Sequence, residues 1–154
     1  MENIIIRIAT MPDIDTLLVF EQGVVTAERP FDSTLKKEYI LYYDLEYMIL
    51  ADHIQLLVAE LNGELIGCGY ARIEDSKHYL QHAQHSYLGF MYVHPTHRGI
   101  GVNKIIMDEL FKWSASKNIH EIRLDVYYEN AAAIKAYEKA GFAKHMIEMR
   151  VGLK

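Results

Sequence analysis

The stretch "HPTHRGIGVNKIIM", His94–Met107, joins an apolar segment to a helical pattern. Gly99 and Gly101 stand where this helix is predicted to begin, although glycine costs about 1 kcal/mol relative to alanine inside a helix. Glycine lacks a Cβ, so a ligand can approach its backbone closely. The first N–H groups of a helix have no partner within it, and the helix dipole adds about half a positive charge there. The stretch predicts a site for an anion such as a diphosphate, with a turn that only needs positive φ as the alternative.

Two other phosphate-binding motifs do not fit this loop. A Walker A loop needs Gly-Lys-Ser/Thr, which is absent. The dinucleotide fingerprint needs a third glycine about where Lys104 stands. After the loop, apolar residues at i, i+3, i+4, i+8 and i+11 from Val102 to Trp113 predict one buried helix face.

The segments around the loop predict a mixed α/β (α+β) fold in the order β-α-α-β-β-β-α-β-α-β. Asn62-Gly63 predicts a two-residue hairpin turn. The predicted strands are 4–9, 54–61, 64–73, 87–93, 119–127 and 146–151. The predicted helices run from Pro12 to about Thr26, from Ser33 to Ile49, from Val102 to Trp113 and from Asn130 to Gly141.

Composition limits the class of protein. The chain has 154 residues, 51% of them hydrophobic, and a formal net charge of −5. This length predicts one domain, residues 1–154, with a self-supporting core. We expect no nucleic-acid partner because no basic stripe is present, and no membrane span because no apolar run approaches about 20 residues. Cys68 is the only cysteine, which excludes an internal disulfide, and no leader is recognisable, so we expect a cytoplasmic protein.

A second motif is "YYENAAAIKAYEKAGFAK", Tyr127–Lys144. Asn130, Ala133 and Tyr137 stand at i, i+3 and i+7, so they form one stripe on the last predicted helix. Small alanines would let a ligand lie close to this stripe, beside the Tyr137 phenol. The alternative is that Tyr137 only packs in the core.

The two motifs together closely resemble the GNAT superfamily of acetyl-CoA-dependent N-acetyltransferases. The matching pieces are "YVHP", "RGIG" and the pattern N-x-x-A-x-x-x-Y-x-x-x-G-F, within 88–142. The resemblance implies a mixed central sheet that is splayed between its fourth and fifth strands. It also implies direct transfer of an acetyl group from acetyl-CoA to a primary amine. A non-catalytic sensor domain that binds coenzyme A or an acyl-CoA is the alternative.

The resemblance implies roles for the motif residues. Arg98–Asn103 would hold the diphosphate of coenzyme A, the backbone of Met91–Val93 would pair with the pantetheine arm, and Asn130 would contact the cofactor. Tyr137 would be the general acid, and its phenol lies within about two pKa units of a thiol. The implied cofactor-binding residues are Met91, Tyr92, Val93, Arg98, Gly99, Ile100, Gly101, Val102, Asn103, Asn130, Ala133 and Tyr137.

Two positions depart from the family pattern. Asn103 stands where the family prefers Gly or Ala, and it would either crowd the phosphates or donate a hydrogen bond to them. Tyr87 stands where many members carry a glutamate that acts as general base. His85, Tyr87 and Glu74 are the candidate bases, and we place His85 or an ordered water ahead of Glu74 because imidazole titrates near pH 7.

The sequence says less about the acceptor of the acetyl group and about binding partners. The resemblance places Glu28, Phe31 and Tyr87 beside the acceptor, which is a small-molecule amine or a peptide or protein amine. His78, His82 and His85 have the i, i+4, i+7 spacing of zinc ligands, but they lie in a polar connector, so we expect no metal. A homodimer is left open.

Overall fold

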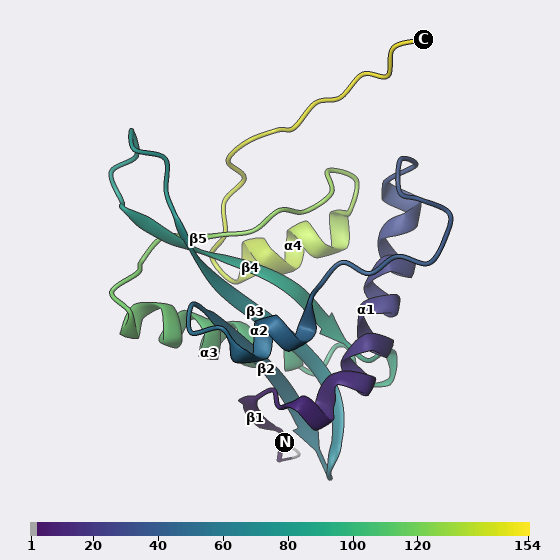
Figure 1. Cartoon of the computed structure of the whole chain (residues 1–154), viewed down its shortest axis with the longest axis vertical. Helices are drawn as coiled ribbons and strands as arrows, with labels where there is room; N and C mark the ends of the chain where they lie inside the picture. The colour runs from purple at the N-terminus through teal and green to yellow at the C-terminus, as the bar shows by residue number, and fades with distance from the viewer. Residues whose placement is uncertain (1–2) are drawn as a thin grey trace. The chain divides into compact units, whose positions relative to one another are not determined.

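The structure is a computed structural model that describes residues 3–154. It falls into two compact units, Met1–Leu124 and Asp125–Lys154, and their union into the predicted single domain stays a prediction. In chain order, the first unit contains β1 (Ile5–Ile8), α1 (Ile14–Glu28), α2 (Leu45–Leu50), β2 (Ile54–Leu61), β3 (Glu64–Asp75), β4 (Gln84–Val93), α3 (Val102–Ser116) and β5 (Ile122–Arg123) (Figure 1). The second unit contains α4 (Ala131–Lys139).

The five strands form one mixed sheet in the order β1-β2-β3-β4-β5, which confirms the predicted fold class. Neighbouring strands are antiparallel except β4 and β5, which are parallel. The β2–β3 hairpin turns at Asn62 and Gly63, whose φ angles are 52° and 83°. Both positions tolerate positive φ, so the predicted two-residue turn is confirmed.

Helices cover both faces of this sheet, as β3 shows. Successive strand residues point to opposite faces. Tyr70 packs in a core cluster with Phe20 of α1 and Met48 of α2. On the other face, a Cβ added at Gly69 would lie 3.0 Å from Ile106 of α3. The face that carries Tyr70 is therefore the one covered by α1 and α2.

The helix predicted from Ser33 to Ile49 is wrong for most of its length. Only α2 forms, and residues 32–44 are a loop with neither helix nor strand. The Asp32 carboxylate accepts a hydrogen bond from the Thr34 N–H (2.9 Å), which makes a turn at the place where Ser33 was expected to cap a helix. Side chains of α1 then bind the backbone groups of the loop, so these groups do not pair within a helix.

Two predicted strands also differ from the structure. The strand expected at 119–127 is only Ile122–Arg123, because β5 pairs with β4 at just two positions. The closing strand expected at 146–151 is absent, since residues 142–154 form no helix or strand. The alternating apolar pattern at 146–151 is typical of a strand, but a strand also needs a neighbouring strand for its backbone hydrogen bonds. Within Asp125–Lys154 the structure describes no strand with which this segment could pair.

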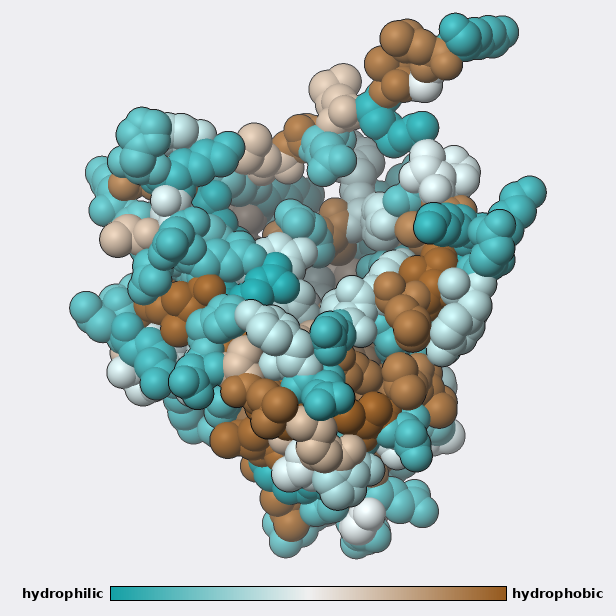
Figure 2. Space-filling view, viewed as in Figure 1, coloured by the Kyte–Doolittle hydropathy of each residue, from teal (hydrophilic) through white to brown (hydrophobic). Residues whose placement is uncertain are grey.

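Hydrophobic residues also reach the surface. Figure 2 shows them gathered over the lower part of the view, where α2 and the start of α1 lie (Figure 1). Val19 of α1 and Leu50 of α2 are 67% and 66% exposed. Within residues 3–154, no helix is long and apolar enough to cross a membrane.

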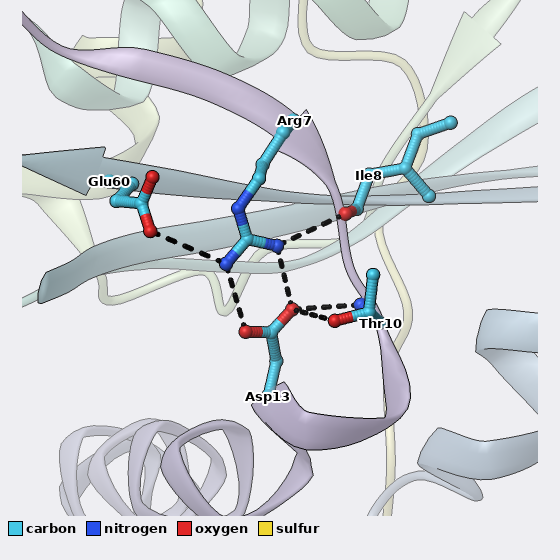
Figure 3. A network of polar contacts seen from close by, with 5 residues as sticks. All are labelled: Arg7, Ile8, Thr10, Asp13 and Glu60. Atoms are coloured by element: carbon cyan, nitrogen blue, oxygen red, sulfur yellow. Dashed lines mark hydrogen bonds and ion pairs between the residues drawn. The ribbon is translucent and has the colours of Figure 1, made fainter. Parts of the chain in front are cut away.

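A network of polar contacts fixes the junction between β1 and α1 (Figure 3). Both carboxylate oxygens of Asp13 accept hydrogen bonds from the Arg7 guanidinium, at 2.8 and 3.0 Å. Asp13 also accepts from the Thr10 N–H (2.8 Å), and Glu60 lies 3.6 Å from Arg7. The hydrogen bonds from Arg7 above all lower the pKa of Asp13 to about 2, although burial opposes the shift.

This network predicts acid-sensitive stability. A carboxyl whose pKa falls on folding stabilises the protein above its unfolded pKa, and the contribution is lost as pH falls through about 2. We expect Asp13→Asn to lower the free energy of unfolding by about 2 kcal/mol at pH 7 and to flatten its decline between pH 4 and 2. Denaturant titrations at several pH values would measure this, with exposed Asp15→Asn as the control. Equal losses of unfolding free energy in Asp13→Asn and Asp15→Asn would contradict this role of the network.

Candidate functional site

The sheet opens on one side of β4. β4 pairs with β5 only at Ser86 and Tyr87, so the stretch from Leu88 to Val93 has no neighbouring strand on that side within the described part of the chain. The β3–β4 register shifts between Cys68 and Tyr70, opposite Phe90, whose φ is 51°. An extra residue of this kind bends a strand and strengthens its twist. The bulge lies within the stretch of β4 that has left β5, where it bends the strand, and the predicted splay is confirmed.

The bulge also turns backbone N–H groups toward the open side. The Ser86 N–H donates to Glu121 O (2.9 Å), on the β5 side, before the bulge. After the bulge, the His94 N–H donates to Ile66 O (2.7 Å), toward β3. Because N–H directions alternate along a strand, Met91 and Val93 direct theirs to the open side. Met91–Val93 thus offers the unpaired backbone that was predicted for the pantetheine arm.

The glycine loop follows directly after β4. Gly99 and Gly101 have φ angles of 82° and 90°, which favour glycine. A Cβ added at either residue would meet no atom within 4 Å. Both glycines are exposed, so the backbone between them is open to a ligand. The loop therefore has both features that the sequence offered as alternatives, a turn with positive φ angles and a backbone that a ligand can approach.

The first turn of α3 leaves its N–H groups available. The first backbone bond of the helix runs from the Ile105 N–H to Gly101 O (3.1 Å). In residues 3–154, no backbone carbonyl accepts from the N–H groups of Val102, Asn103 or Lys104. Gly101 is the N-cap and has no side chain to accept from them. This end of α3 therefore combines free donors with the positive end of the helix dipole.

Arg98 is held at the start of this loop. Its Nε donates to Val93 O (2.9 Å), and its guanidinium lies 5.9 Å from the centre of the Tyr92 ring. Tyr92 itself packs against Phe20 with ring centres 4.8 Å apart, and α1 approaches it so closely that a Cβ at Gly23 would be 2.6 Å from the ring. The packing of Tyr92 on α1 thus steadies the ring beneath Arg98.

Asn103 lies in the same first turn. Its Oδ1 is buried, and no hydrogen-bond donor among residues 3–154 reaches it. Ile100 is 48% exposed in the loop, whereas Val102 is buried. The predicted cofactor residues from Met91 to Asn103 therefore extend along the chain from the open side of β4 to the first turn of α3.

Aromatic rings line the α1 and α2 face of the sheet beside the bulge. Tyr43 stacks on Phe90 with ring centres 4.6 Å apart and meets Tyr70 edge-on at 5.9 Å. Tyr87, one of the candidate bases, is 6.5 Å from Tyr70. The Arg72 guanidinium lies over Tyr70 and Tyr87, at 5.6 and 5.3 Å. Tyr70 and Arg72 were not among the residues predicted from the sequence. They stand two and four residues after Cys68 on β3, and this period-2 spacing indicates that the three side chains share one face of the sheet.

The candidate bases His85 and Glu74 contact each other at the other end of β4. His85 Nε2 lies 3.2 Å from Glu74, and Nδ1 lies 2.9 Å from Ser76 Oγ. Glu74 also pairs with Arg72 at 2.6 Å. Five residues of strand, roughly 16 Å, separate His85 from the bulge at Phe90. No cluster of three or more metal-ligating side chains occurs in the described part of the chain.

Glu28 and Phe31 lie where α1 ends. Glu28 is in the last turn of α1, and Phe31 is in the 3-10 turn Arg29–Phe31 that follows. Both are half-buried. Burial above all raises the pKa of Glu28, the charge of Asp32 adds to this, and a side-chain hydrogen bond with Tyr42 opposes it. These contacts place Glu28 beside the loop that carries Tyr42.

In the second unit, α4 carries the predicted stripe. Asn130 caps the helix, and its Oδ1 accepts from the Ala133 N–H (3.3 Å). The half-buried Tyr137 lies on the same stripe, and its ring meets Phe142 edge-on at 5.8 Å. Gly141 has a φ of 105°, and the Phe142 N–H donates to Tyr137 O (3.0 Å), which ends the helix as predicted. Because the Asn130 oxygen is used by the cap, its amide nitrogen is the group left for a ligand.

Comparisons with known proteins agree with this arrangement. The family model described as "Acetyltransferase (GNAT) family" matches residues 22–142. An acetyltransferase from Pectobacterium atrosepticum is 33% identical over 99 residues, and the match covers 62% of each chain, so less than two thirds of that relative is spanned. An N-alpha-acetyltransferase from Sulfolobus acidocaldarius is 29% identical over 146 residues, covering 91% of this chain and 80% of the relative.

A solved structure has the same fold. It is a predicted acetyltransferase from Clostridium acetobutylicum with acetyl-CoA, and it is 20% identical with a TM-score of 0.72. The similarity covers 97% of this chain and 96% of that one. The family model covers most of the present chain, including the open strand, the glycine loop and α4. The chain therefore belongs to the acetyltransferase (GNAT) family.

Proposed function

We propose that this protein transfers an acetyl group from acetyl-CoA to a primary amine, by direct transfer without a covalent enzyme intermediate. The observation that carries the proposal is a run of unpaired N–H groups in two stretches, at Met91 and Val93 on the open side of β4 and at Val102–Lys104 in the first turn of α3. Such a run suits a ligand that has both an extended amide-containing arm and a diphosphate. Acetyl-CoA is such a ligand, and it supplies the acetyl group as an activated thioester.

The α3 end of the run fits the diphosphate. The N–H groups of Val102, Asn103 and Lys104 are free donors, and no side chain at Gly99 or Gly101 stands in front of them. Arg98 adds a charged donor that is already held by Val93 O. Asn103 lies on the same turn, and we expect it to modify the binding of the phosphates without abolishing it.

The β4 end of the run fits the thioester arm. The N–H groups of Met91 and Val93 are candidate partners for the amides of the thioester arm. One of them could instead donate to the thioester oxygen, as in an oxyanion hole. Tyr137 on α4 is the proposed acid for the departing sulfur. Its ordinary pKa of about 10 lies close to that of a thiol, so proton transfer to a thiolate costs little.

The acceptor is proposed to meet Glu28, Phe31 and Tyr87. The classes retained are a small-molecule amine and the amine of a peptide or protein. The name of the Sulfolobus relative supports the α-amino group of a peptide as one member of this set. A cytoplasmic location and a homodimer remain predictions from the sequence.

The competing function is a domain that binds acetyl-CoA without chemistry, and the tyrosine at position 87 favours it because the family's glutamate is missing there. The test incubates the protein with acetyl-CoA and a panel of primary amines: a peptide with a free α-amino group, an amino acid, a polyamine and an aminoglycoside. Thiol release and product mass report transfer, and calorimetry reports coenzyme A binding. Binding without acetylation of any amine would establish the sensor; acetylation of one would exclude it.

A further inference from the structure

Two carboxylates, Glu21 and Glu28, lie two turns apart on one face of α1. Glu21 is 0% exposed, and its Oε2 accepts hydrogen bonds from the backbone N–H groups of Tyr42 and Tyr43. A carboxylate that accepts two N–H groups fixes the backbone that donates them. Glu21 therefore sets the position of Tyr42 and Tyr43 on α1.

Gln22 of α1 and Arg29, the first residue after α1, hold the rest of the 32–44 loop. Gln22 Nε2 donates to Ile40 O (2.8 Å). The Arg29 guanidinium donates to Lys36 O (2.6 Å) and Glu38 O (3.1 Å). Hydrogen bonds with α1 and with the turn that follows it therefore anchor the loop along its length, and Tyr42 and Tyr43 have defined places beside α1.

Tyr43 connects the end of α1 with the bulge of β4. Its ring stacks on Phe90, the bulge residue in the stretch of β4 that is not paired with β5. Burial above all raises the pKa of the Tyr43 phenol well above its usual value, and the charges of Tyr70 and Glu28 add to the shift. Tyr43 thus stays protonated, and the charge of Glu28 acts on a ring that lies against the bulge.

Glu28 has no cationic partner. It forms none of the ion pairs found in residues 3–154. The groups that act on it are Asp32, a second carboxylate, and the phenol of Tyr42. Arg29, its neighbour in the chain, is used by the loop carbonyls. A half-buried carboxylate without a counter-charge, next to aromatic rings, is favourable for a cation.

We propose that Glu28 binds the ammonium group of the acceptor and takes its proton, in place of the family's strand glutamate. This inference rests on the proposed function, because it needs an amine acceptor near the bulge of β4. Glu28 would then be a catalytic residue, and Glu21 a positioning residue that acts through Tyr42 and Tyr43. The raised pKa of Glu28 makes its carboxylate a better proton acceptor than an exposed glutamate.

The other candidates are less suited to this step. Glu74 already pairs with Arg72, and both ring nitrogens of His85 have partners. These two residues also lie near the start of β4, whereas Tyr43 links Glu28 to the bulge.

The chemistry balances without a further reactant. The acceptor ammonium gives one proton to the Glu28 carboxylate. The neutral nitrogen then forms a C–N bond with the acetyl carbon, and the C–S bond breaks. The sulfur takes the Tyr137 proton, and the second proton of the nitrogen restores the phenol. Glu28 releases its proton to water, so the products are an N-acetyl amine, coenzyme A thiol and one proton.

The test compares pH profiles of kcat/KM for Glu28→Gln and native protein, using the panel amine that the native protein acetylates fastest. We expect kcat/KM to fall about 100-fold at pH 7 in Glu28→Gln and its acid limb to disappear, while the coenzyme A dissociation constant is unchanged. Glu38→Gln removes the same charge from the exposed part of the loop and should keep the native profile. Glu28→Asp should restore part of the rate and the acid limb.

Several outcomes would overturn the inference. An acid limb that persists in Glu28→Gln and disappears in His85→Gln would assign the base to His85. If kcat/KM falls equally in Glu28→Gln and Glu28→Asp, and both variants unfold at a lower temperature, Glu28 has a structural role only. If the native protein binds coenzyme A but acetylates no panel amine, this inference falls together with the N-acetyl transfer, while the family assignment stands.

Discussion

Replacing Tyr137 with Phe is expected to lower kcat about 100-fold while leaving the coenzyme A dissociation constant unchanged. The substitution removes only the hydroxyl and keeps the ring that meets Phe142 at the end of α4. A departing thiolate needs a proton, and the phenol is the acid that the resemblance implies. Without it, the thiolate must leave unprotonated or wait for a proton from water.

The measurement is a single-turnover experiment, so that product release does not mask the chemical step. Tyr128→Phe is the matched control, because Tyr128 is 81% exposed and lies in the same unit just before α4. It loses the same hydroxyl and should keep the native rate. A native single-turnover rate in Tyr137→Phe would show that the sulfur needs no phenol at this position.

The features that sequence predicted correctly are those fixed by local chemistry. Asn62-Gly63 turns as expected because both residues tolerate positive φ. Gly101 and Gly141 stand at the predicted beginning and end of helices because glycine adopts left-handed φ without strain. In each case the residues that decide the structure lie within a few positions of one another.

The features that sequence missed depend on contacts between distant segments. The 32–44 loop has apolar residues at helical spacing, yet Glu21 and Gln22 of α1 and Arg29 just after it bind its backbone, which no local pattern reveals. The bulge at Phe90 likewise has only a weak local signal in the neighbouring Gly89. In the candidate site, the diphosphate loop could be found from the motif. The link from Glu28 through Tyr43 to Phe90 could not, because it joins residues more than 60 positions apart.

Gly101→Val is expected to weaken coenzyme A binding by about 100-fold. The branched side chain would stand in space that is now empty, directly before the free N–H groups of Val102 and Asn103. Losing several charge-assisted hydrogen bonds to the diphosphate is worth about 3 kcal/mol, which corresponds to this factor. Calorimetric titration with coenzyme A measures the change directly and needs no acceptor.

The difficulty with this variant is backbone strain, since Gly101 has a φ of 90° and valine rarely adopts positive φ. Gly63→Val is the matched control, because Gly63 has a φ of 83° and also has no atom within 4 Å of an added Cβ. Both variants should lose similar unfolding free energy, but only Gly101→Val should lose affinity. If both bind coenzyme A equally well, the first turn of α3 does not hold the diphosphate. Equal weakening in both would mean that strain alone is responsible, and the assignment of this loop would then have to be abandoned.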